Sequence, residues 1–245
     1  MKKLIRDFFN KYFFRQHPDA ALRYYPVVEA IKKAKLEDSK ILEVGSGGLG
    51  ITPYLKKNID GLDVYFDPPL SDMINRIKGS ADKLPFRKNS YDVVICVDVL
   101  EHINSQLRQS AIFEMIRVAK KLAIIVVPQG TLSEQQDQEL NNYWQKTFHN
   151  QNRFLEEHVQ NGLPKTEEIL VTIDKSLRKL DKKAKVTSRP YLNLAVRKVI
   201  MRTWISNNKF LYYLYLKGYL LLLPVLKLAN WGNCYRRAFV IEFAS

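Results

Sequence analysis

The sequence predicts an α/β protein built on a mostly parallel sheet, and two features indicate this fold class. Short apolar runs bounded by turn residues predict strands at 40–45, 61–66, 90–100 and 121–128. Between the last two runs, residues 104–120 place apolar side chains near helical spacing. Apolar strands that alternate with helices are typical of a parallel sheet covered on both faces.

Helices are also expected before the first strand. Residues 20–34 predict one helix. Upstream of it, apolar and aromatic residues from Leu4 to Phe13 recur at helical spacing among basic residues, which predicts an amphipathic helix. Two interpretations of this helix stay open, namely packing over the domain or its active-site mouth, and insertion into a membrane interface. A secretory signal is not expected, because Asp7 and several basic residues interrupt the apolar positions.

After Pro128 the strand–helix alternation stops. Residues 131–162 are polar, aromatic and prone to form helices, and 165–182 predict an amphipathic helix. Strands are expected at 185–191 and at the C-terminal run 235–243. We therefore expect one domain in three parts, with a helical cap at 1–37, a ligand-binding core at 38–130, and a lid, a helical insertion and the last strands at 131–245.

The segment 210–229 is apolar and nearly long enough to span a bilayer. Lys217, Gly218 and Pro224 interrupt it, and the chain must then return to the sheet in the final strand. We therefore expect broken helices here, buried or interfacial, and no membrane span.

Composition limits the possible partners. The chain has 245 residues, 46% of them hydrophobic, and two cysteines, which excludes a disulfide-rich scaffold or a four-cysteine zinc site. Its net charge of +14 is uneven, at +5 for 1–40, +1 for 41–130 and +8 for 131–245. An anionic partner is therefore expected to meet the basic flanks rather than the near-neutral middle.

A glycine-rich loop directly follows the first predicted strand. It reads EVGSGGLG from Glu43, and Gly45, Gly47 and Gly50 fit the G-x-G-x-x-G spacing. Asp63 ends the next strand 18 positions after the first glycine, where an acid can accept hydrogen bonds from ribose hydroxyls. An ordinary tight turn would also use glycines, so the loop alone does not decide the ligand.

Two nucleoside cofactors suit this layout. A dinucleotide needs a full helix N-terminus for its pyrophosphate, yet only a short segment with Pro53 separates the loop from the next strand. Glu43 places a carboxylate toward the glycine loop, which suits a cationic ligand such as the methionine amino group of S-adenosyl-L-methionine. The sequence therefore favours this sulfonium cofactor.

Four segments in order, namely ILEVGSGGLG, GLDV, GSADKLPFRKNSYDVVICVDVLEHI and IRVAKKLAIIVVP, resemble the class I S-adenosyl-L-methionine-dependent methyltransferases with a domain of the methyltransferase 11 type. The resemblance covers roughly 38–130. It implies a Rossmann-like, seven-stranded, mostly parallel sheet with an antiparallel last strand, a helical N-terminal cap and helical insertions in the C-terminal half.

The resemblance also implies which residues bind the cofactor. Many relatives have an aspartate at the position of Ser80, so the adenine contact is expected to differ here. The cofactor-binding residues would be Glu43, Gly45, Ser46 and Gly47 for the methionine part, Asp63 for the ribose hydroxyls, Ala81 and Asp82 for the adenine, and Asp98 for the sulfonium end.

His102 is a candidate catalytic residue, because a neutral imidazole can accept a proton from an acceptor hydroxyl or amine. The alternative is that Glu101 and His102 cap the next helix. Asp98 is a second candidate catalytic residue, and it suits positioning of the cofactor better than proton transfer. His149 and His158 are expected to be solvated or structural, and no bound metal is expected, since no cluster has metal-ligand spacing along the sequence.

The predicted function is methyl transfer by in-line displacement to oxygen or nitrogen of a small-molecule, glycan or lipid-linked acceptor. The segments 162–164 and 233–243 are similar to methyltransferases of microbial surface-glycan and lipid-linked pathways. Cytoplasmic localisation is expected, with attachment to an anionic membrane surface at its inner face as a further prediction. Alternatives are an RNA or protein methyltransferase, although no RNA-binding module is recognisable, and a non-catalytic protein that binds the cofactor.

Overall fold

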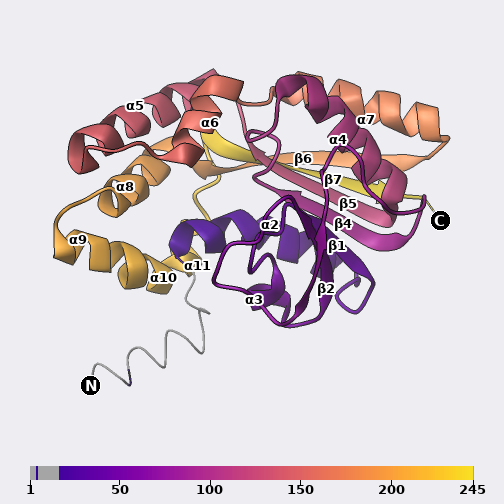
Figure 1. Ribbon diagram of the computed structural model, residues 1–245, viewed down its shortest axis with the longest axis horizontal. Helices are drawn as coiled ribbons and strands as arrows, with labels where there is room; N and C mark the ends of the chain where they lie inside the picture. Colours follow the sequence, from indigo (N-terminus) through magenta and orange to yellow (C-terminus); the bar gives the residue numbers. More distant parts are fainter. Residues whose placement is uncertain (1–3, 5–16, 245) are drawn as a thin grey trace.

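The computed structural model describes Leu4 and residues 17–244, which fold around one seven-stranded sheet with helices on both faces (Figure 1). The strand order is β3-β2-β1-β4-β5-β7-β6. Strands β1 to β5 pair in parallel, whereas β7 is antiparallel to both of its neighbours. This confirms the expected fold class. The strands are β1 (Ile41–Val44), β2 (Ile59–Asp63), β3 (Ile74–Lys78), β4 (Tyr91–Val97), β5 (Ala119–Pro128), β6 (Ala184–Asn193) and β7 (Cys234–Phe243).

Strand β3 was not located from the sequence. It forms the edge of the sheet and reads INRIK, with only its first residue buried, so it has no apolar run. Strand β2 begins two residues earlier than expected and ends at Asp63, which leaves Val64 and Tyr65 exposed. An edge strand with polar side chains is typical of sheets that avoid pairing with other chains.

One face of the sheet is covered by α4 (Ser105–Val118) and α7 (Thr166–Leu180). Helix α7 buries Ile169, Ile173 and Leu177 at spacings of four residues, so a single stripe of its surface contacts α4 and the sheet. Both helices confirm the expected segments.

The opposite face is covered by α2 (Pro18–Lys33), the short α3 (Thr52–Leu55), α8 (Leu194–Trp204) and the π-helical turn η1 (Leu214–Gly218). Helix α2 confirms the helix expected at 20–34, and Val27 and Ile31 on it are completely buried. Helix α8 was not expected, because its apolar residues are interrupted by arginine and lysine.

Helices α5 (Thr131–Phe148) and α6 (Arg153–Asn161) confirm the helix-prone segment and lie beside the carboxyl ends of the parallel strands (Figure 1). The side chain of Arg108 at the start of α4 donates hydrogen bonds to the carbonyl oxygens of Asn161 and Gly162 at the end of α6. Trp144 of α5 packs against Trp204 of α8, with ring centroids 5.0 Å apart. These contacts hold the two helices over one edge of the sheet.

The segment 210–229 forms broken helices, as expected: α9 (Lys209–Tyr213), η1, α10 (Tyr219–Leu221) and α11 (Leu223–Leu226). The π-helical turn contains Lys217 and Gly218, and Pro224 lies at the start of α11. Among the described residues, no helix has both the length and the apolar character that a bilayer crossing requires. The amphipathic helix expected at the N-terminus falls on residues outside the described part of the chain, Leu4 excepted.

Candidate functional site

Three acidic residues meet at one edge of the sheet because each lies at or just beyond the carboxyl end of a parallel strand. Glu43 lies in β1, Asp63 ends β2, and Asp98 directly follows β4. Strand β1 pairs with both β2 and β4, so the three positions are neighbours. In open α/β sheets, ligands bind at this edge.

The glycine loop follows β1 and needs glycine for two different reasons. Gly45 has φ of +75°, and a Cβ atom there would lie 2.1 Å from a methyl group of Val99. Gly47 has φ of +53°, and a Cβ atom there would have no atom within 4 Å. Gly45 thus permits close packing against the β4 loop, while Gly47 leaves its own side of the loop open.

Asp63 links β2 to this open side. Its Oδ2 atom accepts a hydrogen bond from the backbone N–H of Gly47 at 2.8 Å, and its Oδ1 atom accepts one from the N–H of Tyr65 at 3.2 Å. The carboxylate is only partly buried, so each oxygen has a further lone pair for a ligand. Ser46, beside Gly47, is buried and donates to the Gly47 carbonyl oxygen at 3.2 Å.

Glu43 lies beneath the loop and is completely buried. One carboxyl oxygen accepts a hydrogen bond from the Tyr24 hydroxyl, and the other accepts one from the backbone N–H of Ile51, both at 2.7 Å. Burial raises the pKa of Glu43 to about 8, although both hydrogen bonds favour the ionised form. Glu43 therefore organises the loop from within the protein, and its predicted contact with a ligand stays a prediction.

The predicted adenine side follows β3. A bridge between Ser80 and Lys83 forms a tight turn that buries Ala81 and leaves Asp82 half-buried. The Ser80 hydroxyl hydrogen-bonds to the Asp82 carboxylate. Ser80 therefore orients the neighbouring acid at the same edge of the sheet.

Asp98 is enclosed by two arginines. Its carboxylate accepts hydrogen bonds from Nε and Nη2 of Arg236 at 2.9 and 2.6 Å, and Nε of Arg23 lies 3.4 Å away. Both arginines also pair with Asp19 of α2. Burial raises the pKa of Asp98, but the two guanidinium groups outweigh it and lower the pKa overall. Such a carboxylate is a poor proton acceptor, which favours positioning over proton transfer.

His102 does not act as a helix cap, since Asn104 caps α4 through its side chain. Instead, Nδ1 of His102 lies 2.8 Å from Oε2 of Glu157 on α6. Burial, and after it the nearby His158, lower the pKa of His102 to about 4. His102 is therefore a neutral imidazole at physiological pH.

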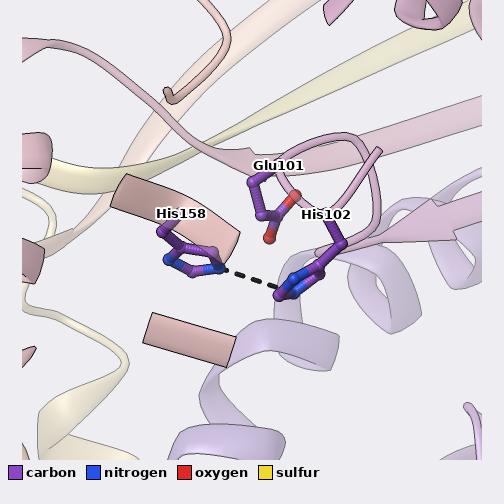
Figure 2. A group of neighbouring side chains, drawn as sticks. All are labelled: Glu101, His102 and His158. Atoms are coloured by element: carbon purple, nitrogen blue, oxygen red, sulfur yellow. Dashed lines mark hydrogen bonds between the residues drawn. The ribbon is translucent and has the colours of Figure 1, made fainter. Parts of the chain in front are cut away.

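His158 is not solvated, since it is paired with an acid, and its expected structural role stays a prediction. Its Nδ1 atom lies 2.8 Å from Oδ2 of Asp137 on α5, a carboxylate that also accepts hydrogen bonds from Tyr235 and pairs with Arg197. Its Nε2 atom lies 3.4 Å from Nε2 of His102 (Figure 2). By contrast, His149 is exposed at the end of α5.

Several residues of this edge were missed at the sequence level, namely Tyr24, Arg236, Asp137 and Glu157. One signal was available for Arg236, because two adjacent arginines interrupt the apolar run of the last strand and one of them must face the sheet interior. The acids that pair with the histidines gave no signal, since they are separated from them by 21 and 55 residues.

Two surface depressions lie away from the glycine loop. One lies between α5 and α8 beside Gln136 and Lys198, and the other lies between α4 and α7 beside Asp82. Neither includes a residue of the loop.

The comparisons with known proteins agree with the fold. Residues 42–127 match the family model described as a methyltransferase domain. A curated relative, an uncharacterized protein of Methanocaldococcus jannaschii, is 26% identical over 149 residues. That match covers 55% of this chain and 65% of the relative, so the chain spans less than two thirds of the relative's length.

Among solved structures, phosphoethanolamine N-methyltransferase 2 of Haemonchus contortus in complex with S-adenosyl-L-methionine superposes with a TM-score of 0.53. The identity is 15%, and the match covers 98% of this chain and 60% of that chain. At 15% identity, this likeness shows a shared fold and nothing further.

Proposed function

We propose that this chain, which has the Rossmann-like fold of class I methyltransferases and carries a methyltransferase domain at residues 42–127, is an S-adenosyl-L-methionine-dependent methyltransferase. The observation that carries the proposal is the pairing of the Gly47 N–H with Asp63 at the open side of the glycine loop. This pairing presents a partly exposed carboxylate beside a backbone that a ligand can approach closely.

Each of the proposed site residues would contact a different part of the cofactor. Asp63 would accept hydrogen bonds from the ribose hydroxyls, because its carboxylate lies at the end of β2 with lone pairs to spare. The glycine loop and Ser46 would contact the methionine part, and the turn at Ala81 and Asp82 would contact the adenine. Asp98 would lie near the sulfonium end, held in place by Arg236.

Bound S-adenosyl-L-methionine supplies an electrophilic methyl group on a positively charged sulfur. In-line attack on that group depends chiefly on alignment of the two reactants, so the protein needs to hold them rather than to activate them strongly. His102 is the candidate proton acceptor for a hydroxyl acceptor when no metal ion is bound, since Glu157 occupies its Nδ1 side and its Nε2 faces only the neighbouring Nε2 of His158, 3.4 Å away, among the described residues.

Calorimetry with S-adenosyl-L-methionine tests the cofactor assignment. We expect Asp63→Asn to weaken binding roughly 10- to 100-fold, as expected for losing hydrogen bonds to a charged group worth about 1.5–3 kcal/mol. Asp60→Asn is the matched control, because Asp60 lies on the same strand but bonds to Asn75 and Tyr91 instead. Absent binding by the wild type, or equal binding by Asp63→Asn, would overturn the proposal.

For the acceptor, we propose a lipid-linked or glycan molecule met at an anionic membrane surface. Large apolar side chains are exposed along the broken helices, including Phe210, Tyr213, Val225, Leu228 and Trp231. Residues 131–245, to which they belong, have a net charge of +8, which is the sign that anionic headgroups attract. An exposed apolar patch of this kind supports binding to a protein or a membrane.

The acceptor is identified by tracing an isotope-labelled methyl group by mass spectrometry in cells with and without the gene. Label in lipids or lipid-linked glycans is expected. Label found only in RNA or only in protein would contradict this acceptor class while leaving the cofactor assignment intact.

A further inference from the structure

We propose that Glu101, His102 and His158 form a binding site for a divalent transition-metal ion of the zinc type, placed between the loop after β4 and helix α6 (Figure 2). One potential ligand atom from each side chain lies within 4.8 Å of the other two. Two imidazoles and one carboxylate are a donor set that zinc and neighbouring metals use in proteins.

The hydrogen bonds of the two histidines fix which nitrogen atoms are available. A carboxylate faces Nδ1 of each ring at 2.8 Å, Glu157 for His102 and Asp137 for His158. With a carboxylate at each Nδ1, the remaining ring nitrogen of each histidine is Nε2, and the two Nε2 atoms face each other at 3.4 Å. Both Nε2 atoms are therefore placed to bind one metal ion from adjacent sides.

Glu101 supplies the second observation. It is completely buried, and neither carboxyl oxygen has a hydrogen-bond partner in another residue. Buried polar groups are normally paired, so a buried carboxyl group without partners beside two histidine nitrogens suits the binding of a cation.

The contacts between Nδ1 of each histidine and a carboxylate resemble those around metal-binding histidines. In such sites, the histidine ligand donates its second ring N–H to a carboxylate or a carbonyl oxygen, which fixes the ring and makes the ligand more basic. Both histidines have that contact, and both carboxylates are themselves held. Arg153 pairs with Glu157 at 2.7 Å, and Arg197 pairs with Asp137 at 2.7 Å.

The spacing of the nitrogens favours a tetrahedral ion. With metal–nitrogen bonds of 2.0–2.1 Å, two ligands of a tetrahedral zinc ion lie about 3.4 Å apart, and the two Nε2 atoms lie 3.4 Å apart. Three protein ligands leave a fourth position for water or for an oxygen of the methyl acceptor. Binding of an acceptor oxygen rests on the proposed function. In either case, Nε2 of His102 is a metal ligand when the ion is bound and not a proton acceptor.

The test uses full-length protein without a histidine tag, stripped of metal with a chelator and titrated with zinc chloride in the calorimeter. We expect one equivalent to bind to the wild type. Glu101→Gln and His158→Ala should lose this binding, and Glu157→Gln should weaken it about 10- to 100-fold. Cobalt(II) provides a second readout, since the visible absorption of a tetrahedral site should appear in the wild type and not in Glu101→Gln or His158→Ala.

His149→Asn is the matched control, because it removes an exposed histidine and asparagine tolerates the left-handed conformation at that position. Glu101→Gln keeps the shape of the side chain without its charge, so it decides the question if His158→Ala fails to fold. No zinc binding by the wild type, or equal binding by Glu101→Gln, overturns the metal site. Binding of S-adenosyl-L-methionine, measured separately, distinguishes this failure from failure of the proposed function.

Discussion

The acidic residues at the carboxyl edge of the sheet differ in the partners that their carboxyl groups have. Asp98 has two arginine partners, Glu43 has two neutral hydrogen-bond donors, and Glu101 has no partner in another residue. The pKa shifts follow this order, since burial raises the pKa of Glu43 and Glu101 while arginine lowers that of Asp98. A cation bound nearby would therefore stabilise the ionised forms of Glu43 and Glu101.

If Glu43 contacts the cofactor as proposed, we expect it to couple cofactor binding to pH. With a pKa of about 8, its carboxyl group is protonated at pH 6, and a cationic ligand nearby would favour loss of that proton. We expect affinity for S-adenosyl-L-methionine to rise from pH 6 to about 8, by up to about tenfold per pH unit, and then to level off. Calorimetry in buffers of different ionisation enthalpy measures the released proton.

Glu43→Gln is the control for this pH effect. The amide preserves an acceptor for the Ile51 N–H and a donor toward Tyr24, but it does not ionise. Its affinity should lack the Glu43-dependent slope. If both proteins show the same slope, another group is responsible for the linkage.

At the residue scale, the sequence predicted those positions that belong to one continuous motif. Gly45, Gly47 and Asp63 were placed correctly at the edge of the sheet because short loops connect them to strands with clear apolar runs. The partners of His102 and His158 were not predictable, since they lie on helices whose packing depends on tertiary contacts. A cluster of metal-ligating type, assembled from residues 56 positions apart, has no local pattern.

At the scale of elements, helix α2 is tied to the sheet through a buried network of charges. Asp19 and Arg23 of α2 pair with Arg236 of β7 and with Asp98 after β4. The network contains two carboxylates and two guanidinium groups, so its formal charge is zero. It connects the helical cap to both strands that border the proposed sulfonium end.

Arg236→Met should destabilise the fold by about 3–5 kcal/mol, because it leaves two buried carboxylates with only one cation. Urea unfolding at neutral pH measures this loss. Arg237→Ala is the neighbouring control, since Arg237 is half-buried and donates a hydrogen bond to Ser188, and a change of about 0.5 kcal/mol is expected there. A similar loss in both variants would contradict the role of the network.

Acid should weaken the same network. The pKa values of Asp19 and Asp98 are lowered, with burial opposing ionisation and the arginines outweighing it. Their stabilisation is therefore present above the ordinary aspartate pKa of 3.8 and is lost as the pH falls through the lower values in the folded state. Asp19→Asn combined with Arg236→Met should recover part of the loss, because one uncompensated carboxylate is removed.

Elements were predicted where their burial pattern is simple. Strands β1, β4 and β5 are buried on both sides and read as apolar runs, and α7 has one apolar stripe. Strand β3 has one buried residue and α8 buries Arg197 among its core residues, so neither matches an apolar template. Pairing at a sheet edge and burial of a charged side chain both depend on neighbours that are distant in sequence.

At the scale of the whole molecule, net positive charge and exposed apolar side chains coincide in residues 131–245. This part has a net charge of +8, and Phe210, Tyr213 and Trp231 are among its large exposed aromatic side chains. Helix α7 lies on the opposite face of the sheet from η1 and its flanking helices (Figure 1). Two faces of one molecule can therefore be compared in a single membrane-binding experiment.

We expect the full chain to sediment with vesicles that contain anionic phospholipid, less at high salt, because the attraction between basic residues and headgroups is screened. Replacing both Phe210 and Trp231 by serine should weaken binding roughly 100-fold, since burying each aromatic side chain contributes about 1.5–3 kcal/mol. Val171→Ser on α7 removes an exposed apolar side chain from the opposite face and should leave binding unchanged. Equal binding by the double variant would show that these aromatic side chains do not insert into the membrane. Binding that does not depend on salt concentration would show that the basic residues do not attract the protein to the headgroups.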